Sequence, residues 1–489
     1  MESKDRGKTM TKRRRRHPVR RLLRALVLLV LLGVVYSVVV GYMPFSRAPK
    51  LSDDARARVE ARVEEMSHDV STGDRAAILE TRTEALDERI RLINQAKSSL
   101  VITTYDCRDG ESTRDILCAV LARAEAGVRV RMLIDGIAGR FHLMHNGMFR
   151  AVAAHPNVEV RFYNLFTYWQ AWKHMGRMHD KYLIADDTAY ILGGRNTFDY
   201  FLGEYPAPTH SLDREALVYN AAGSADSSLF EVLGYFEGVW DGGDATPFRP
   251  RVSDDKRAAE YAALDARREG LRAEKPELFA PADYGAVTVA TRGVWLIHNP
   301  TTIYAKEPEA FAQLTGLMAR AREEIIVHSP YAVLNEDSRA TLSEIAARVP
   351  VTLMINAVEN GQNVVASGDY LLHRDEVLST GMRVLEYAGG DSYHGKSMVI
   401  DDALSVIGSF NLDLRSTYVD TELMLVIRSP ELNATLRGHM AALHADCQER
   451  LPDGTAAVPD GLRFPPLTLG RETLLRLLGL AMQPVRNLV

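Results

Sequence analysis

Two stretches of the chain match each other residue by residue, and this duplication constrains the fold more than any other feature. The first starts at His179 and reads HDKYLIADDTAYILGGRN, and the second starts at His394 and reads HGKSMVIDDALSVIGSFN. In each copy an asparagine follows the histidine by 17 positions, so the two align without a gap. The sequence therefore predicts two copies of one supersecondary unit.

Each copy opens with a His-x-Lys triplet. On a strand, side chains two positions apart point to the same face, so His179 and Lys181 share a face, as do His394 and Lys396. An imidazole can act as nucleophile or acid, and an ammonium group offsets phosphate charge. One such triplet is weak evidence, because exposed His and Lys occur near each other by chance. Two in identical register indicate a phosphodiester site.

Further polar residues recur in both copies. The glycines before Asn196 and Asn411 predict a tight return that turns both amides toward the same phosphate. Each copy is followed by an Asp-x-Glu triplet and then by an apolar strand. The glutamates of these triplets are Glu215 and Glu422. We expect these glutamates to hold a ring nitrogen of a histidine and to fix its tautomer.

The surroundings of the motifs also repeat and predict the fold class. Residues 90–103 and 317–327 each have the pattern of a helix end followed by a buried strand, and 128–134 and 351–355 predict further strands. The pattern indicates an α/β fold of two pseudo-symmetric lobes that share one active site. The expected divisions are 83–241 for the first lobe, 242–285 for a charged linker, 286–451 for the second lobe and 452–489 for a C-terminal tail.

The N-terminal region predicts a membrane anchor. Residues 25–46 form an uncharged span rich in Leu and Val, long enough to cross a bilayer as a helix. The preceding residues 1–24 hold 11 Lys and Arg, which favours a cytoplasmic N-terminus and an exported body after a polar connector at 47–82. A cleaved signal peptide is the alternative.

Charge and cysteine content exclude several function classes. Residues 1–24 carry a net charge of +9 and the rest of the chain −14, a body that disfavours a nucleic-acid partner. Cys107, Cys118 and Cys447 lack metal-ligand spacing and predict buried free thiols, with a Cys107–Cys118 bridge as the alternative. The histidines likewise show no zinc spacing, so we expect no metal and no cofactor.

The duplicated motif resembles the mark of the phospholipase D superfamily, His-x-Lys-x4-Asp twice per chain, and extends from about residue 83 to 451. Within it the sequence is most similar to bacterial cardiolipin synthases, which also carry Gly-Gly-Arg-Asn in the first motif and Gly-Ser-Phe-Asn in the second. The resemblance implies catalytic roles for Asp186 and Asp401 beside the histidines and lysines, and a supporting role for Ser409.

The resemblance also implies the reaction. A phosphatidyl group would pass through a covalent phosphohistidine, with His179 as nucleophile and His394 as general acid, to an alcohol such as phosphatidylglycerol. The resemblance further implies that the substrates are phospholipids and that the protein is located in the bacterial inner membrane. The alternatives are a phospholipase D-type hydrolase and a membrane-anchored nuclease. The sequence specifies no protein partner.

The sequence leaves two alternatives for the role of each of two apolar segments. Residues 161–172 are rich in aromatic side chains and fit either a membrane-facing rim or ordinary core packing. The leucine-rich stretch 464–489 fits either an amphipathic helix on the bilayer surface or a helix docked on the second lobe.

Overall fold

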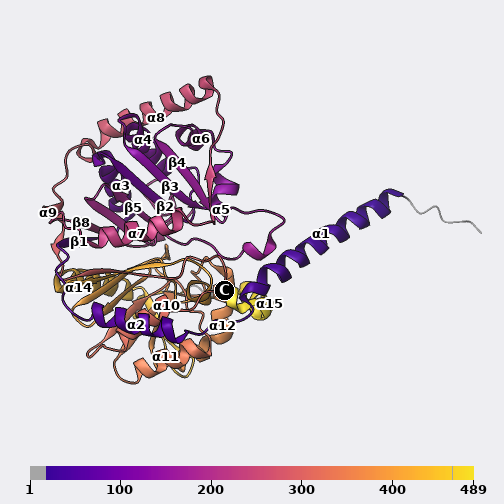
Figure 1. The fold of residues 1–489 in the computed structure, drawn as a ribbon. Helices are drawn as coiled ribbons and strands as arrows, with labels where there is room; N and C mark the ends of the chain where they lie inside the picture. Colours follow the sequence, from indigo (N-terminus) through magenta and orange to yellow (C-terminus); the bar gives the residue numbers. More distant parts are fainter. Residues whose placement is uncertain (1–17, 465) are drawn as a thin grey trace, which may run out of the picture.

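The computed structural model describes residues 18–464 and 466–489 and consists of two lobes, one above the other in Figure 1, with one long helix projecting from them. Each lobe is built on a nine-stranded sheet. The strand orders are β10-β1-β8-β6-β5-β2-β3-β4-β9 and β11-β18-β17-β16-β12-β13-β14-β19-β20. The eight strands from β1 to β9 in the first sheet match those from β11 to β19 in the second in both order and chain sequence, which confirms the predicted duplication.

The strands of the first sheet are β1 (Asp74–Leu79), β2 (Ser99–Thr104), β3 (Arg129–Asp135), β4 (Val158–Tyr163), β5 (Tyr182–Ala185), β6 (Ala189–Gly193), β8 (Glu215–Asn220), β9 (Ala245–Phe248) and β10 (Val289–Ala290). The strands of the second are β11 (Val294–His298), β12 (Ile325–His328), β13 (Val351–Asn356), β14 (Arg383–Tyr387), β16 (Ser397–Ile400), β17 (Leu404–Gly408), β18 (Leu423–Arg428), β19 (Cys447–Arg450) and β20 (Ala456–Ala457). A two-stranded ladder, β7 (Ser211–Leu212) with β15 (Ser392–Tyr393), joins the lobes.

The α-helices are α1 (Pro18–Tyr42), α2 (Asp53–Met66), α3 (Arg82–Gln95), α4 (Glu111–Glu125), α5 (Gly136–Ala138), α6 (Gly147–Ala153), α7 (Ser228–Trp240), α8 (Asp254–Glu274), α9 (Tyr284–Val287), α10 (Glu309–Met318), α11 (Glu336–Ala346), α12 (Val364–Leu378), α13 (Leu414–Tyr418), α14 (Pro430–His444) and α15 (Leu469–Met482). Short helical turns are η1 (Met43–Phe45), η2 (Gly139–Leu143), η3 (Ala171–Lys173), η4 (Pro276–Leu278) and η5 (Gln483–Leu488).

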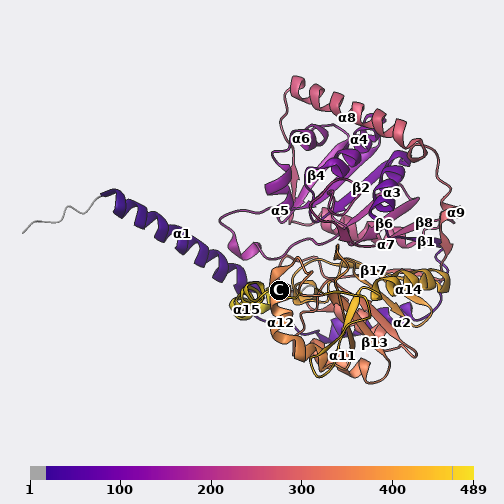
Figure 2. The same cartoon turned by 180° about the vertical axis from the view of Figure 1, so that it is seen from behind.

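The two faces of each sheet belong to different cores. Along β2, Leu100 and Ile102 pack outward with α3 and α4, whereas Val101 faces the other lobe. The inner core joins both sheets through α7 and α14, which lie between the lobes in Figures 1 and 2. Strands buried on both faces explain why their sequences are almost continuously apolar.

Three segments belong to the lobes although the sequence predicted connectors. In the expected connector at 47–82, α2 packs on α10 of the second lobe and β1 is a strand of the first sheet. In the expected linker, α8 is largely exposed but inserts Leu264 and Leu271 against the first lobe. The charge of these helices suggested solvation, but one buried stripe is enough to dock them.

The long apolar helix that the sequence predicts near the N-terminus is present. Residues 20–45 make one helix long and apolar enough to span a bilayer, and it stands away from the lobes. Most of the expected basic N-terminus, residues 1–17, lies outside the described residues. In the C-terminal tail, α15 docks on α12, and all three cysteines are buried free thiols.

Candidate active site

The two His-x-Lys triplets meet at the junction of the lobes. His179 and Lys181 lead into β5, which runs antiparallel to β2, so they lie at the carboxyl end of β2. His394 and Lys396 lead into β16 in the same way. The backbone N–H of His394 donates to Leu212 of the first lobe at 2.7 Å, and that of His179 donates to Thr421 of the second at 3.3 Å. Each triplet is therefore held against the opposite lobe.

Each imidazole receives a carboxyl group from the opposite lobe. Glu422 lies 2.9 Å from Nδ1 of His179, and Asp213 lies 2.7 Å from Nδ1 of His394. Both acidic side chains are almost wholly buried. The expectation for Glu422 agrees with this geometry, and the hydroxyls of Ser409 and Ser416 orient its carboxyl group by donating to it.

Glu215 does not hold a histidine, contrary to the sequence-based expectation. The guanidinium of Arg89 on α3 binds its two oxygens at 2.5 and 2.6 Å, in a fully buried pair. Asp213 takes its place at His394. Gly194 makes this possible, because a Cβ there would meet an Asp213 oxygen at 2.4 Å. The corresponding residue in the second copy is Ser409, whose hydroxyl instead binds Glu422.

Asp186 and Asp401 do not reach the histidines, so the catalytic role expected for them is corrected to a structural one. Both adopt left-handed backbone conformations, with φ of 54° and 50°, in the turns that end β5 and β16. Asp186 accepts from three consecutive backbone N–H groups at the start of β2, those of residues 97–99, each at 2.8 Å. Asp401 likewise accepts from three consecutive backbone N–H groups just ahead of β12, those of residues 322–324, at 3.1, 2.9 and 3.3 Å. Four residues of strand lie between each lysine and its aspartate, which puts the two about 16 Å apart along the strand.

Asn196 and Asn411 lie at the same sheet end as the triplets. The N–H of Gly193 donates to Lys181, and that of Gly408 donates to Lys396, which fixes the start of each return. Asn196 accepts from the backbone of Asp106 at 3.2 Å, whereas the buried amide oxygen of Asn411 has no partner among the described residues.

Burial and the two ammonium groups set the electrostatics of the site. Burial, followed by the charge of the neighbouring lysines, lowers the pKa of His179 well below its usual value and that of His394 to about 3. Burial also lowers the pKa of Lys181 to about 8 and of Lys396 to about 7. The free site thus holds neutral imidazoles and lysines that lose their protons readily.

The two carboxyl groups differ in their charge. Burial raises the pKa of Glu422 to about 8. Burial acts on Asp213 in the same direction, but the hydrogen bond with His394 and the charge of Lys396 outweigh it and hold the pKa of Asp213 below its usual range. His394 therefore faces an ionised carboxylate, while His179 faces a group that keeps its proton near neutral pH.

Sequence reasoning missed several side chains around the histidines. Asp180, between His179 and Lys181, accepts from Tyr235 at 2.8 Å and Thr421 at 2.7 Å, and burial raises its pKa to about 6. The ring edges of Tyr105 and Phe201 pack on His179 and His394, with centroids 5.0 Å apart in both cases. The second copy has glycine in place of Asp180, so the duplication gave no signal for it.

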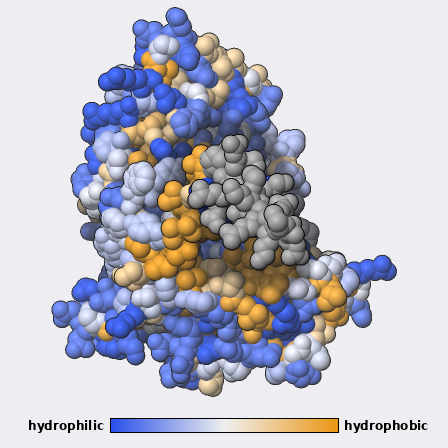
Figure 3. Space-filling view, turned by 90° about the vertical axis from the view of Figure 1, so that its right-hand side faces the viewer, coloured by the Kyte–Doolittle hydropathy of each residue, from blue (hydrophilic) through white to orange (hydrophobic). Residues whose placement is uncertain are grey.

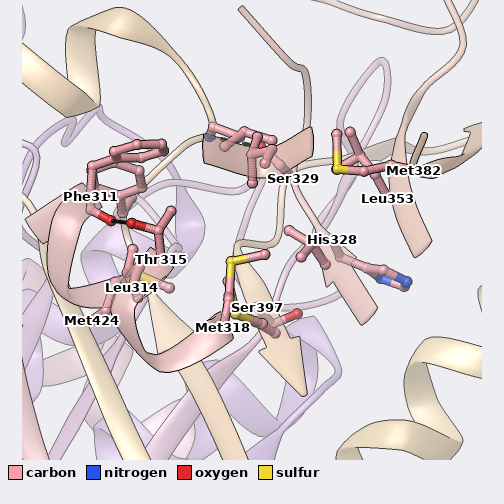
Figure 4. A pocket seen from close by; sticks show the side chains of 15 residues that line it. Phe311, Leu314, Thr315, Met318, His328, Ser329, Leu353, Met382, Ser397 and Met424 are labelled. Atoms are coloured by element: carbon pink, nitrogen blue, oxygen red, sulfur yellow. Dashed lines mark hydrogen bonds between the residues drawn. The ribbon is translucent and has the colours of Figure 1, made fainter. Parts of the chain in front are cut away.

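The site opens beside His394. A cleft of about 290 Å³ there is lined by polar side chains that include Tyr331, Asn363 and Ser367. A separate cavity of about 40 Å³, shown in Figure 4, lies in the apolar core of the second lobe among Phe311, Leu314 and Met424. Among the described residues no group of three His, Cys, Asp or Glu side chains has the arrangement of a metal site.

Comparison with known proteins agrees with this geometry. Residues 89–199 and 314–444 match a family model described as "Cardiolipin synthase, PLD-like domain". The chain therefore belongs to the phospholipase D superfamily, with one repeat of its domain in each lobe.

The chain is also similar to individual proteins and to a solved structure. The chain is 26% identical over 410 residues to cardiolipin synthase C of Escherichia coli K12, covering 72% of this chain and 81% of that protein. It is 24% identical to an uncharacterised Helicobacter pylori protein, over 83% and 85% of the respective chains. A crystal structure of phosphatidylserine synthase from Haemophilus influenzae shares the fold, with a TM-score of 0.60 at 16% identity, covering 89% of this chain and all of that one.

Proposed function

We propose that the chain is a membrane-anchored phosphatidyltransferase of the cardiolipin synthase type, which moves a phosphatidyl group from a phospholipid to an alcohol such as phosphatidylglycerol. The observation that carries this proposal is the pair of imidazoles whose Nδ1 atoms are held by carboxyl groups from opposite lobes. Nε2 of each ring is not held by a carboxyl group and is the nitrogen that reacts; at His394 it lies 3.0 Å from Nζ of Lys396. Similarity to cardiolipin synthases supports the substrate class.

The two histidines divide the reaction between them. When the anionic phosphodiester binds, its charge favours uptake of a proton by His394, which is neutral in the free site. Nε2 of His179 then attacks phosphorus, and the bond to the headgroup oxygen breaks as the His394 imidazolium gives its proton to that oxygen. His394 then takes the proton of the acceptor hydroxyl, whose oxygen attacks phosphorus and releases His179. The ionised Asp213 favours the imidazolium that His394 must become, whereas protonated Glu422 keeps His179 neutral and nucleophilic. Lys181 and Lys396 offset the charge of the phosphate.

The test is product analysis with the purified chain in phosphatidylglycerol vesicles. Transfer predicts cardiolipin and free glycerol, and both should vanish in His179→Asn and in His394→Asn. The exposed His68, which pairs with Glu64 far from the motifs in sequence, supplies the matched control His68→Asn. Release of phosphatidic acid without cardiolipin would identify a hydrolase instead. Cleavage of single-stranded DNA with no lipid product would overturn the proposal in favour of a nuclease.

We further propose that the lobes face the exported side of the bacterial inner membrane. The supporting observation is the cluster of basic residues before the apolar span, since positive flanks stay cytoplasmic. A reporter that is active only outside the cytoplasm, fused after Val489, should be active. Activity of a cytoplasmic reporter at the same position would reverse the orientation.

A further inference from the structure

An aromatic loop, residues 165–173, follows β4 and lies directly against α1. Its last turn, η3, packs on α1 at the buried Gly41, where a Cβ would meet the carbonyl oxygen of Ala171 at 3.0 Å. Further along α1, the hydroxyl of Tyr36 donates to the carbonyl oxygen of Trp169 at 3.4 Å. The loop therefore follows the last two turns of the membrane helix away from the lobes.

The exposed apolar residues of α1 indicate how deep in the bilayer this loop lies. Val38 and Val39 are 49% and 52% exposed, between Tyr36 and the lobes. They belong to the apolar span, so the bilayer that accepts α1 must reach them. Tyr36 lies two to three residues farther from the lobes, about 3–5 Å along the helix axis. Trp169, which contacts Tyr36, is consequently level with lipid.

The side chains of the loop suit that position. Trp169 is 84% exposed and Tyr168 59%, and Phe141 of the neighbouring turn is 54% exposed. The guanidinium of Arg140 lies 5.9 Å from the centre of the Tyr168 ring. Exposed Trp and Tyr with a basic residue among them are typical of the boundary between acyl chains and headgroups.

A second apolar surface flanks α1 where it enters the lobes. On α15, Leu474, Leu477 and Leu480 are more than half exposed, while Leu475 on the opposite side of the helix is buried. The chain end that follows is tied to the base of α1, because the amide of Asn487 donates to the carbonyl oxygen of Phe45 at 3.2 Å. Figures 1 and 2 both place α15 beside that base. In Figure 3, viewed from the side where α1 projects, hydrophobic residues gather on this face.

We propose that the aromatic loop and the outer face of α15 both insert into the surface of the bilayer that α1 crosses, one on each flank of the helix. Their continuity with the spanning helix identifies lipid as the occupant. This contact goes beyond the proposed reaction and does not depend on it. It also places the cleft near lipid, since α12, on which α15 docks, contributes Ser367 to the lining beside His394.

Depth-dependent fluorescence quenching tests the insertion with the full chain. All three native cysteines are buried, so Trp169→Cys and Leu477→Cys give single sites for an environment-sensitive dye. The Trp169 contact with Tyr36 uses a backbone oxygen and survives the substitution. Val287, 61% exposed on α9 at the other side of the molecule, provides the control Val287→Cys. The labelled proteins are reconstituted in vesicles of phosphatidylethanolamine and phosphatidylglycerol.

The expected result is a several-fold stronger quenching of the labels at 169 and 477 by shallow nitroxide lipids than of the label at 287. Aqueous iodide should quench only the label at 287. Iodide quenching without lipid quenching at either 169 or 477 would overturn the proposal. Protection from both quenchers would also overturn it, by indicating a second copy or another protein. If a variant fails to fold, Tyr168→Cys or Leu480→Cys replaces it. None of these readouts needs turnover, so a failed reaction and a failed insertion are distinguishable.

Discussion

At the scale of single residues, the sequence pattern assigns the contact with His394 to Glu215, but in the structure Asp213 makes that contact and Glu215 pairs with Arg89. Asp213→Asn should lower kcat by about 10³-fold or more, because it removes the charge that stabilises the His394 imidazolium. Its unfolding temperature should change little. Glu215→Gln should instead destabilise the fold by about 3–5 kcal/mol, since Arg89 is left buried without its partner. Kinetics and thermal unfolding of both variants check this; equal loss of kcat without destabilisation in Glu215→Gln would contradict it.

The two active-site lysines predict the alkaline limb of the pH profile. Burial lowers their pKa values to about 8 for Lys181 and about 7 for Lys396, so each carries its positive charge below that pH and loses it above. Phosphate binding needs that charge. We therefore expect kcat/KM to fall as pH rises from about 7 to 9, and the fall to move to higher pH in Lys396→Arg if that variant is active. A profile that stays flat to pH 10 would show that both ammonium groups remain charged.

At the scale of elements, the crossing of α12 and α15 relies on two glycines. A Cβ on Gly479 would meet the carbonyl oxygen of Gly368 at 2.6 Å, and backbone cannot move aside cheaply. Gly479→Ala should therefore loosen α15, cost about 1–3 kcal/mol and expose the C-terminal tail to protease. Gly470→Ala on the same helix meets no atom within 4 Å and should leave stability unchanged or improve it. Equal protease resistance in the two variants would argue that α15 is not docked there.

At the scale of the whole molecule, the site requires both lobes at once. His394 comes from the second lobe and its carboxylate partner Asp213 from the first. If the two act as one unit, the double variant His394→Ala/Asp213→Asn should be no more than a few fold slower than His394→Ala alone. Additive losses, measured as kcat in a double-mutant cycle, would mean that Asp213 acts independently of the histidine.

The sequence by itself determined the duplication, the α/β class, the long apolar N-terminal helix and the two His-x-Lys triplets. These follow from local patterns: side chains two apart share a strand face, and an uncharged apolar span of this length is long enough to cross a bilayer as a helix. The gap-free register also predicts the return before Asn196 and Asn411, which the structure places at the sheet end that holds the triplets; that both amides face one phosphate stays a prediction.

Only the tertiary structure decided which acid meets which imidazole, and where Asp186 and Asp401 lie. Residues at equivalent places in the two repeats have different neighbours. Glu215 pairs with Arg89, and because Gly194 has no side chain, Asp213 has room to bind His394. Likewise, the turn conformation of Asp186 points its carboxylate at the backbone ahead of β2, about 16 Å of strand away from Lys181. Which buried charges pair depends on residues that are far apart in the sequence and meet only in the folded structure, so the local sequence pattern cannot predict these pairs.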